Sequence, residues 1–269
     1  EHLEEKLLES QEPGDFVDTS EPKEDEPVAD LVRGADGETL LPVLAAKDSK
    51  SGSTYTMPVP QKGAAIDYPV KVLKEIVENL GYRRIILKMD RESSLKKLRQ
   101  RLVATCKDVE FLRDDVPVGE SQSNGEIESM IGVTTGLMRT LKSALVGRYG
   151  AVLNPKHPAL AWLIQYAGTI YTRTAVGVDG KTPYQRNRGV PFHFEQGLPE
   201  FGECIWYRPL ASKAGKRYKL DPDRYLEGVY VGLVDSAKEV QVMTPQGVVR
   251  ARAIKRKPES ASWNAEFFK

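Results

Sequence analysis

The spacing of apolar residues changes near residue 200, and this change limits the fold more than any other feature of the sequence. Before that point, short apolar runs typical of strands alternate with longer segments whose apolar residues recur every three to four positions, as they do in helices. After it, only short apolar runs occur, separated by Gly, Pro, Asp and Lys. This pattern predicts an α/β sheet of mixed direction followed by a small all-β barrel.

Charge is distributed unevenly along the 269 residues, although the net charge is only +1. Residues 1–40 hold fourteen acidic and three basic side chains, a net −11, so the rest of the chain carries +12. The polar, acidic composition of residues 1–26 predicts a disordered linker. We expect an α/β domain over residues 27–200, a barrel over residues 201–258 and a tail over residues 259–269.

Several classes of protein are excluded by what the sequence lacks. No apolar run approaches the length of a membrane span, and no signal-peptide pattern opens the chain, so we expect neither membrane insertion nor secretion. The two cysteines, Cys106 and Cys204, are too far apart for paired-cysteine zinc spacing and form no disulfide framework. A reducing compartment, the nucleus or the cytoplasm, fits this cysteine usage.

The apolar pattern predicts the individual elements of both domains. Asp67 suits a helix N-cap and Gly81 a helix stop, and the strand that follows is expected to be buried and to carry Asp90 at its end. The expected strands of the first domain are residues 27–32, 40–46, 55–58, 84–89 and 109–112, and its helices are residues 67–80, a segment around 95–103, 121–149 and 158–172. The expected barrel strands are residues 204–207, 228–234, 239–244 and 248–254.

Two acidic residues at predicted element ends are candidates for metal ligands. Asp90 follows a strand, and Glu128 lies 38 positions later inside a helix. Carboxylate oxygens brought together across a sheet suit Mg²⁺ and Mn²⁺. Among 38 acidic residues such a pair is not specific by itself, because most carboxylates are solvated surface groups.

The sequence around these acids resembles that of the integrases of retrovirus-like retrotransposons, especially copia-like elements, over residues 28–257. Gln122-Ser-Asn-Gly-Glu-Ile-Glu128 matches the family segment Gln-x-Asn-Gly-x-x-Glu, which makes Glu128 rather than Glu126 the ligand that the resemblance implies. The other matching segments, in family order, are the strand ending in Asp90, the Trp162 helix, Gly180-Lys-Thr-Pro-Tyr-Gln-Arg186 and Glu200-Phe-Gly-Glu203. The implied fold of the first domain is ribonuclease-H-like.

The first aspartate of the family's catalytic trio has more than one candidate. Asp30 fills its place on the first strand, while Asp18, Asp15 or loss of the ligand stay open. Asp48 follows the second strand, where the family often has an aspartate that is not a ligand. Two departures from the family are that Arg91-Glu92 follows Asp90 and that no His/Cys zinc module precedes the core.

The resemblance implies two Mg²⁺ or Mn²⁺ ions held by Asp30, Asp90 and Glu128, a site that processes DNA 3′ ends and joins them to target DNA. The implied partners are double-stranded DNA, as element ends and target, and further copies of this chain in a homo-oligomer. Basic residues beside the acids and in the barrel are candidates for DNA phosphate contacts, although each could equally be a solvated surface group. They are Lys88, Arg91, Arg139, Lys142, Arg250, Arg252, Lys255 and Arg256.

Four aromatic residues are expected to be buried, and two other functions are consistent with the same sequence. Trp162 is expected in the core of its helix face, and Trp206, Tyr207 and Tyr230 are expected in the barrel core rather than as base-stacking platforms. A ribonuclease-H-type nuclease would share fold and metals, but it usually has a fourth acid. It also lacks segments such as Thr182-Pro-Tyr184. A decayed or co-opted integrase would bind DNA without cutting it.

Overall fold

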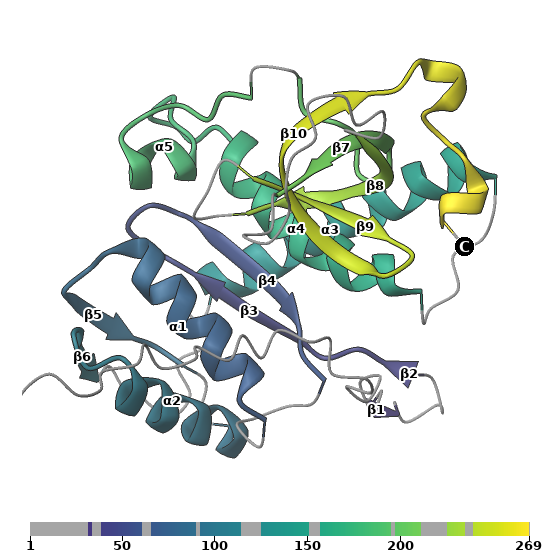
Figure 1. The fold of residues 1–269 in the computed structure, drawn as a ribbon. Coiled ribbons are helices and arrows are strands. Elements are labelled where there is room, and N and C mark those ends of the chain that lie inside the picture. The colour runs from purple at the N-terminus through teal and green to yellow at the C-terminus, as the bar shows by residue number, and fades with distance from the viewer. Residues whose placement is uncertain are drawn as a thin grey trace, which may run out of the picture.

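The computed structural model describes residues 32–33, 39–60, 66–89, 92–113, 125–150, 157–194, 197–210, 225–234 and 239–268. It shows a mixed α/β arrangement of helices and strand pairs with a small closed barrel next to it (Figure 1). The helices are α1 (Tyr68–Leu80), α2 (Ser93–Thr105), α3 (Gly125–Tyr149), α4 (Pro158–Thr174) and α5 (Pro183–Arg188). The strands of the first part are β1 (Val32–Arg33), β2 (Thr39–Leu40), β3 (Val43–Lys47), β4 (Thr54–Pro58), β5 (Arg84–Leu87) and β6 (Glu110–Arg113).

These six strands form separate pairs among the described residues. β1 pairs with β2 and β3 with β4, both antiparallel, whereas β5 and β6 are parallel and are connected through α2. The expected three-stranded meander is therefore present as two hairpins, and the expected first strand lies outside the described residues except for Val32. The single mixed sheet is not shown.

Helix α1 begins and ends close to the predicted residues. Gly81 closes it in the left-handed conformation (φ 69°), which glycine adopts without a steric penalty. Asp67 occupies the N-cap position as predicted, although its side chain makes no cap hydrogen bond. Its carboxylate instead forms an ion pair with Arg101 of α2, which lies beside α1.

The barrel agrees closely with the sequence pattern. Its strands are β7 (Cys204–Pro209), β8 (Leu226–Leu233), β9 (Val240–Thr244) and β10 (Gly247–Arg256). They close in the order β10-β7-β8-β9 with antiparallel neighbours throughout. Two short 3₁₀ turns, η2 (Glu259–Ala261) and η3 (Ala265–Phe268), follow the last strand. All four predicted strands are confirmed.

Two apolar clusters hold these elements together. The first, here called the barrel core, joins the inside of the barrel to α4 and the end of α3. Its most deeply buried members include Leu145, Ala159, Leu163, Ile205, Val229, Tyr230, Val242 and Ala251. The second, here called the α1–α2 core, is formed by Val70, Leu73, Val77, Leu98, Leu102 and Cys106, with partly buried residues of β3, β5 and β6 packed against it.

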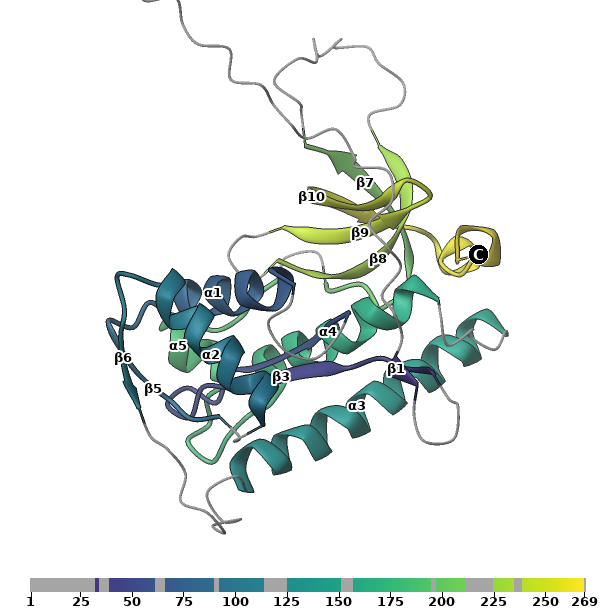
Figure 2. The same ribbon diagram turned by 90° about the horizontal axis from the view of Figure 1, so that it is seen from below.

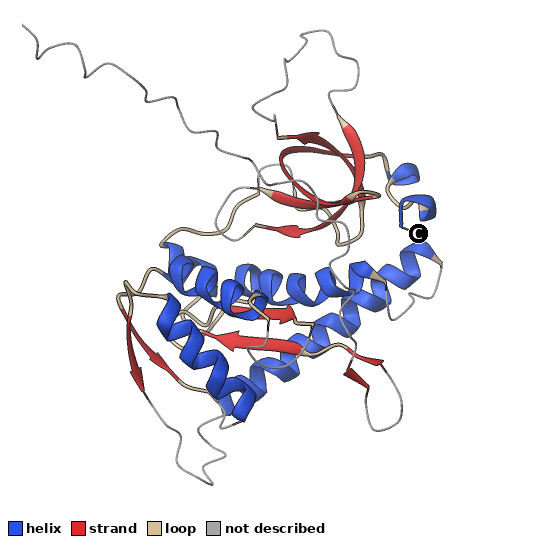
Figure 3. Cartoon of the chain, turned by 60° about the horizontal axis from the view of Figure 1, so that its bottom comes forward, coloured by secondary structure: helices blue, strands red, loops and turns tan. Residues whose placement is uncertain are grey.

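Helix α4 lies between the barrel and the β3–β4 hairpin (Figures 2 and 3). Gly168 permits close contact on the hairpin side, since a Cβ atom there would lie 2.7 Å from the Thr56 hydroxyl and 2.9 Å from the Thr56 nitrogen. The Gly168 nitrogen donates to the Thr56 hydroxyl, which in turn donates to the Ile164 carbonyl at 2.6 Å. On its other side, Tyr166 meets Tyr230 of β8 edge to face.

Two burial predictions were wrong. Strand β5 was expected to be buried, but Ile86 is 63% exposed, because only one face of this two-stranded pair packs on the helices. Trp206 was expected in the barrel core, yet it is half-buried on the outer side, where its indole nitrogen donates to Glu227 and Lys257 lies over its ring. Tyr207 and Tyr230 are buried as predicted, and Trp162 packs against the barrel core.

Candidate functional site

Of the three predicted catalytic acids, the structure describes only Glu128. Asp30 and Asp90 lie outside the described residues, as do the alternatives Asp15 and Asp18. Glu128 is exposed in the first turns of α3, where the N-terminal end of the helix dipole favours a carboxylate. Within the described ranges, no three His, Cys, Asp or Glu side chains are grouped so that they could hold a metal ion.

The structure separates the roles of Glu126 and Glu128. The Lys47 ammonium lies 3.3 Å from the Glu126 carboxylate, and the Ser49 hydroxyl donates to the same oxygen at 3.1 Å. The Ser49 hydrogen bond and the Lys47 charge lower the pKa of Glu126 below its ordinary value. Glu126, although its side chain is 65% exposed, therefore ties the start of α3 to the end of β3, whereas Glu128 is exposed and forms no ion pair with another described residue.

Lys88 has a minor electrostatic influence on the start of α3. The charge of Lys88, one residue beyond β5, also lowers the pKa of Glu126. Lys88 precedes Asp90 by two positions, and Glu126 precedes Glu128 by two positions. Asp90 itself lies outside the described residues, so the structure does not place it relative to Glu128.

Asp48 has a structural role in the turn between β3 and β4. Its carboxylate accepts hydrogen bonds from the Ser51 nitrogen at 3.0 Å and from the Tyr82 hydroxyl at 2.9 Å. Burial, followed by the hydrogen bond to Asp48, raises the pKa of Tyr82 to about 12. These contacts give Asp48, which the sequence marked only as an aspartate that is not a ligand, a role in holding the turn.

One face of α3 carries Glu128 together with two predicted DNA contacts. Arg139 and Lys142 lie eleven and fourteen residues after Glu128, within about 40° of it around a helix of 3.6 residues per turn. All three are exposed, whereas the buried residue Met130 lies about 200° away from Glu128 on the opposite side. The polar stripe extends along the axis for about 21 Å, at roughly 1.5 Å per residue.

The predicted basic residues of the barrel have different surroundings. Arg256 forms two hydrogen bonds, of 2.7 and 2.9 Å, to Glu203, whose side chain is 1% exposed, and Arg252 donates to Glu239 at 2.8 Å. The Lys255 ammonium lies 4.7 Å from the Tyr225 ring centroid. Arg250 is exposed, and no ion pair joins it to another described residue. Arg91 lies outside the described residues, while Lys88 is exposed.

Some contributors to this region were not identified from the sequence. Lys47 and Ser49 hold the start of α3 although they lie 79 and 77 positions before Glu126, and no short motif marks such a long-range contact. Arg186 was identified only as the last residue of the matching segment Gly180-Lys-Thr-Pro-Tyr-Gln-Arg186. It pairs with Asp179, whose pKa it lowers, and donates to the Ser51 carbonyl at 3.0 Å, which joins the turn before α5 to the β3–β4 hairpin.

Comparison with known proteins gives only weak structural similarity. No protein-family model matches the sequence, and no curated protein does. Among solved structures, one chain of the cryo-EM structure of the simian T-cell lymphotropic virus intasome in complex with PP2A regulatory subunit B56 gamma has a TM-score of 0.37 and 14% identity. The match covers 88% of this chain and 85% of that chain. A TM-score this low does not establish a shared fold. No described helix is long and apolar enough to span a membrane.

Proposed function

We propose that this chain is a metal-dependent DNA strand-transfer enzyme of the integrase type, with Asp30, Asp90 and Glu128 as its catalytic carboxylates. The observation that carries the proposal is that Glu128, the acid selected by the segment Gln122-Ser-Asn-Gly-Glu-Ile-Glu128, is exposed at the start of α3, and that the Lys47–Glu126 ion pair holds this helix start against the end of β3. The proposal places Asp90, three residues beyond β5, and Asp30 beside it. Carboxylates from strand ends and a helix start are suited to sharing divalent ions.

The fold that we propose for residues 27–200 is ribonuclease-H-like, with the two strand pairs as parts of one mixed sheet. Leu44 of β3, Ile85 of β5 and Phe111 of β6 all pack against the same α1–α2 core. One layer of helices thus covers both pairs, as it would cover a single sheet. The parallel β5–β6 pair with α2 as its connection is the type of unit that such sheets contain.

The metal site would be formed by Asp30, Asp90 and Glu128, with two Mg²⁺ or Mn²⁺ ions as the proposed cofactors. Both acids are exposed, but Glu126 pairs with Lys47, whereas Glu128 forms no ion pair with another described residue and fits a ligand role. When bound, the ions would activate a water or a DNA 3′-hydroxyl and stabilise the leaving oxygen. The exposed stripe of Arg139 and Lys142 would hold DNA phosphates that lead away from Glu128.

The test is a strand-transfer assay with a double-stranded oligonucleotide, in Mg²⁺ and in Mn²⁺, on Glu128→Gln and Glu126→Gln. Both changes remove one negative charge from the same helix start. Glu128→Gln should lower the joining rate by a thousandfold or more, on the order expected when a ligand of the catalytic metals is removed, with DNA affinity nearly unchanged. Glu126→Gln should retain joining. The Glu126 carboxylate contacts Lys47 and Ser49 and is not one of the proposed metal ligands.

The outcomes separate the alternatives. Wild-type joining rates for Glu128→Gln would end the catalytic assignment. DNA binding without joining by the unmodified chain in either metal would instead support a decayed or co-opted integrase. Cleavage of the RNA strand of an RNA–DNA hybrid without joining would support a ribonuclease-H-type nuclease.

A further inference from the structure

The residues that follow the barrel, expected only as a tail, pack over the junction between the barrel and the end of α3. Figures 1 and 2 show η2 and η3 beside that end of the helix. Trp263, between the two turns, meets the Tyr149 ring edge to face, with 5.5 Å between the ring centroids. The guanidinium of Arg148 lies over the same indole at 5.2 Å. Residues 258–266 are here called the strap.

Beneath the strap, the barrel and α3 approach each other closely at Gly202. A Cβ atom at this position would overlap the Leu145 side chain of α3. The Tyr149 hydroxyl donates to the Gly202 carbonyl at 2.6 Å, and Arg148 pairs with Glu200 at 3.0 Å. The end of α3 therefore lies directly against the segment that leads into β7.

Cys204, the first residue of β7, shows how much the strap covers. Side chains two positions apart on a strand point to the same side, so Cys204 and Trp206 share one face of β7. Trp206 is half-buried, whereas Cys204 is 1% exposed. The Cys204 nitrogen donates to the Ser262 carbonyl at 2.8 Å. Its thiol lies 3.6 Å from the Tyr149 hydroxyl and donates to the Asn264 carbonyl at 4.0 Å, so α3 and the strap cover it together.

The strap itself has few buried contacts. Within residues 258–266, all of them described, Ser262 is buried, Trp263 is half-buried and the others are exposed. The Ser262 hydroxyl donates to the Pro258 carbonyl at 3.0 Å, a contact within the strap. Segments with few buried contacts open at a lower free energy than the whole fold. We therefore expect the strap to separate from the junction more easily than α3 separates from the barrel.

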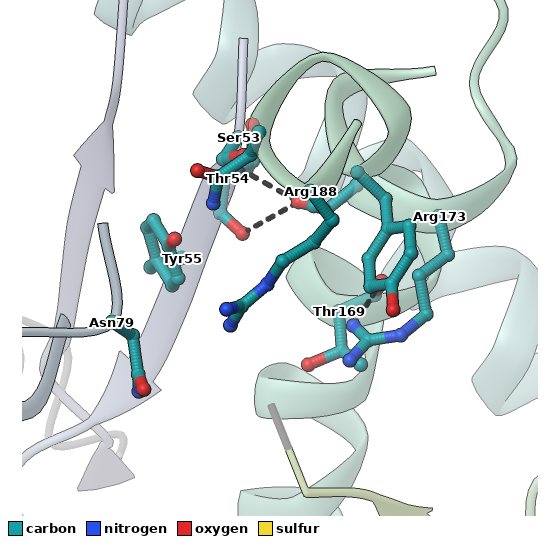
Figure 4. A pocket seen from close by; sticks show the side chains of 10 residues that line it. Ser53, Thr54, Tyr55, Asn79, Thr169, Arg173 and Arg188 are labelled. Carbon is teal, nitrogen blue, oxygen red and sulfur yellow. Dashed lines mark hydrogen bonds between the residues drawn. The ribbon is translucent and has the colours of Figure 1, made fainter. Parts of the chain in front are cut away.

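The junction between α4 and β4 is closed in a different way. The Thr54 nitrogen donates to the Thr172 hydroxyl at 2.8 Å, and that hydroxyl donates to the Thr54 carbonyl at 3.1 Å, with both residues buried (Figure 4). These elements cannot separate without also breaking the Gly168 contact with Thr56. That junction lies inside the molecule, whereas the strap lies at the surface.

We propose that the strap is a conformational device that opens and closes without global unfolding. When closed, it packs on Arg148 and Tyr149 and covers the Cys204 thiol. When open, it uncovers Cys204 while the barrel and α3 stay folded. Because α3 carries Glu128 at its start, the strap helps to fix the barrel to the helix of the candidate site. The proposal does not rest on strand-transfer activity.

Labelling of Cys204 by N-ethylmaleimide tests the proposal on the full chain, with peptide mass spectrometry to distinguish it from Cys106, which is also buried and free. In the unmodified chain we expect slow labelling at a rate that is constant at low urea concentrations, because strap opening exposes little surface. Trp263→Ala should raise the rate about tenfold, since an aromatic contact and a cation–π contact are lost. Removal of residues 259–269 should raise it about a hundredfold.

Trp162→Ala is the matched control. Both tryptophans are partly buried and pack against the barrel core, but Trp162 lies in α4, outside the strap. This change should lower the urea midpoint of global unfolding and leave the labelling rate of Cys204 without urea unchanged. A rise equal to that of Trp263→Ala would overturn the proposal, as would slow labelling after removal of residues 259–269.

The unmodified chain supplies a test that needs no variant. A labelling rate of Cys204 that follows global unfolding at every urea concentration would show that the strap does not open by itself, and would overturn the proposal. A rate that is independent of urea at low concentrations and follows global unfolding only near the midpoint would support it.

Discussion

The barrel core and the α1–α2 core are built in different ways. Strands β7 to β10 close on themselves, and their inward residues, such as Val229, Tyr230 and Val242, have no exposed surface. Strands β5 and β6 form a two-stranded pair that packs through one face and leaves Ile86 and Leu112 exposed. Closure pairs the backbone hydrogen-bonding groups of every strand edge within the barrel, whereas the stability of an open two-stranded pair depends on the elements that cover it. We therefore expect stability to be concentrated on the barrel side.

The largest effect is expected from Tyr230→Ala. This change opens a cavity in the barrel core and removes the edge-to-face contact with Tyr166 of α4. The free energy of unfolding should fall by about 3–5 kcal/mol, measured by urea denaturation and followed through tryptophan fluorescence. Trp162 of α4 and Trp206 of β7 should report one transition. Two separate transitions would show that α4 and the barrel do not share a core.

The next effect in size is expected at Gly168, where α4 touches β4. Gly168→Ala would place a Cβ atom 2.9 Å from the backbone nitrogen of Thr56, so the helix or the strand must move, at a cost of about 1–3 kcal/mol. Gly136→Ala in α3 is the matched control, because nothing lies within 4 Å of its Cβ position. That control should gain about 0.5–1 kcal/mol. A neutral Gly168→Ala would mean that α4 lies farther from the hairpin.

Alkaline pH should weaken the barrel core. Burial raises the pKa of Tyr166 to about 12, above the value near 10 of an unfolded tyrosine. The stabilisation is present below pH 10 and is lost as the pH rises through about 12, by about 1–2 kcal/mol for this hydroxyl near pH 11.5. Denaturation at pH 9 and pH 11.5 should show a smaller loss for Tyr166→Phe than for the unmodified chain. An identical loss would exclude this hydroxyl as the cause.

The smallest effect is expected from Ile86→Thr. The side chain is exposed on the open face of β5, so the free energy of unfolding should change by less than about 0.5 kcal/mol. Ile85→Thr, one position earlier and packed against the α1–α2 core, should cost clearly more. A large loss for Ile86→Thr, equal to that of Ile85→Thr, would show that another part of the chain covers this face.

The same contrast explains which parts of the fold could be predicted from sequence. Short-range periodicity located α1, α4 and all four barrel strands, because each of these elements repeats its apolar pattern over its own length. It did not predict α5, whose six residues are too few for periodicity to appear. It also predicted the wrong burial for Ile86 and Trp206, since the hydrophobicity of a side chain does not indicate which neighbouring element will bury it.

The candidate site could be predicted only through the resemblance, and the structure adds the surroundings of one member. Local sequence placed Glu126 and Glu128 on the same helix start, and a motif was needed to choose between them. The contacts that distinguish them come from Lys47 and Ser49, far away in sequence. Such contacts arise from tertiary packing and leave no local signature in the sequence. Asp30 and Asp90 stay predictions.

The position of α4 has a consequence for how the chain can be cut or recombined. A break near residue 200 appears natural in the amino-acid pattern, but the barrel core runs across it from Leu163 and Tyr166 to Val229 and Tyr230. A fragment that stops there would leave the apolar side of α4 open to water and prone to aggregate. The interchangeable module is therefore the barrel together with α4, so a chimera should exchange both or neither.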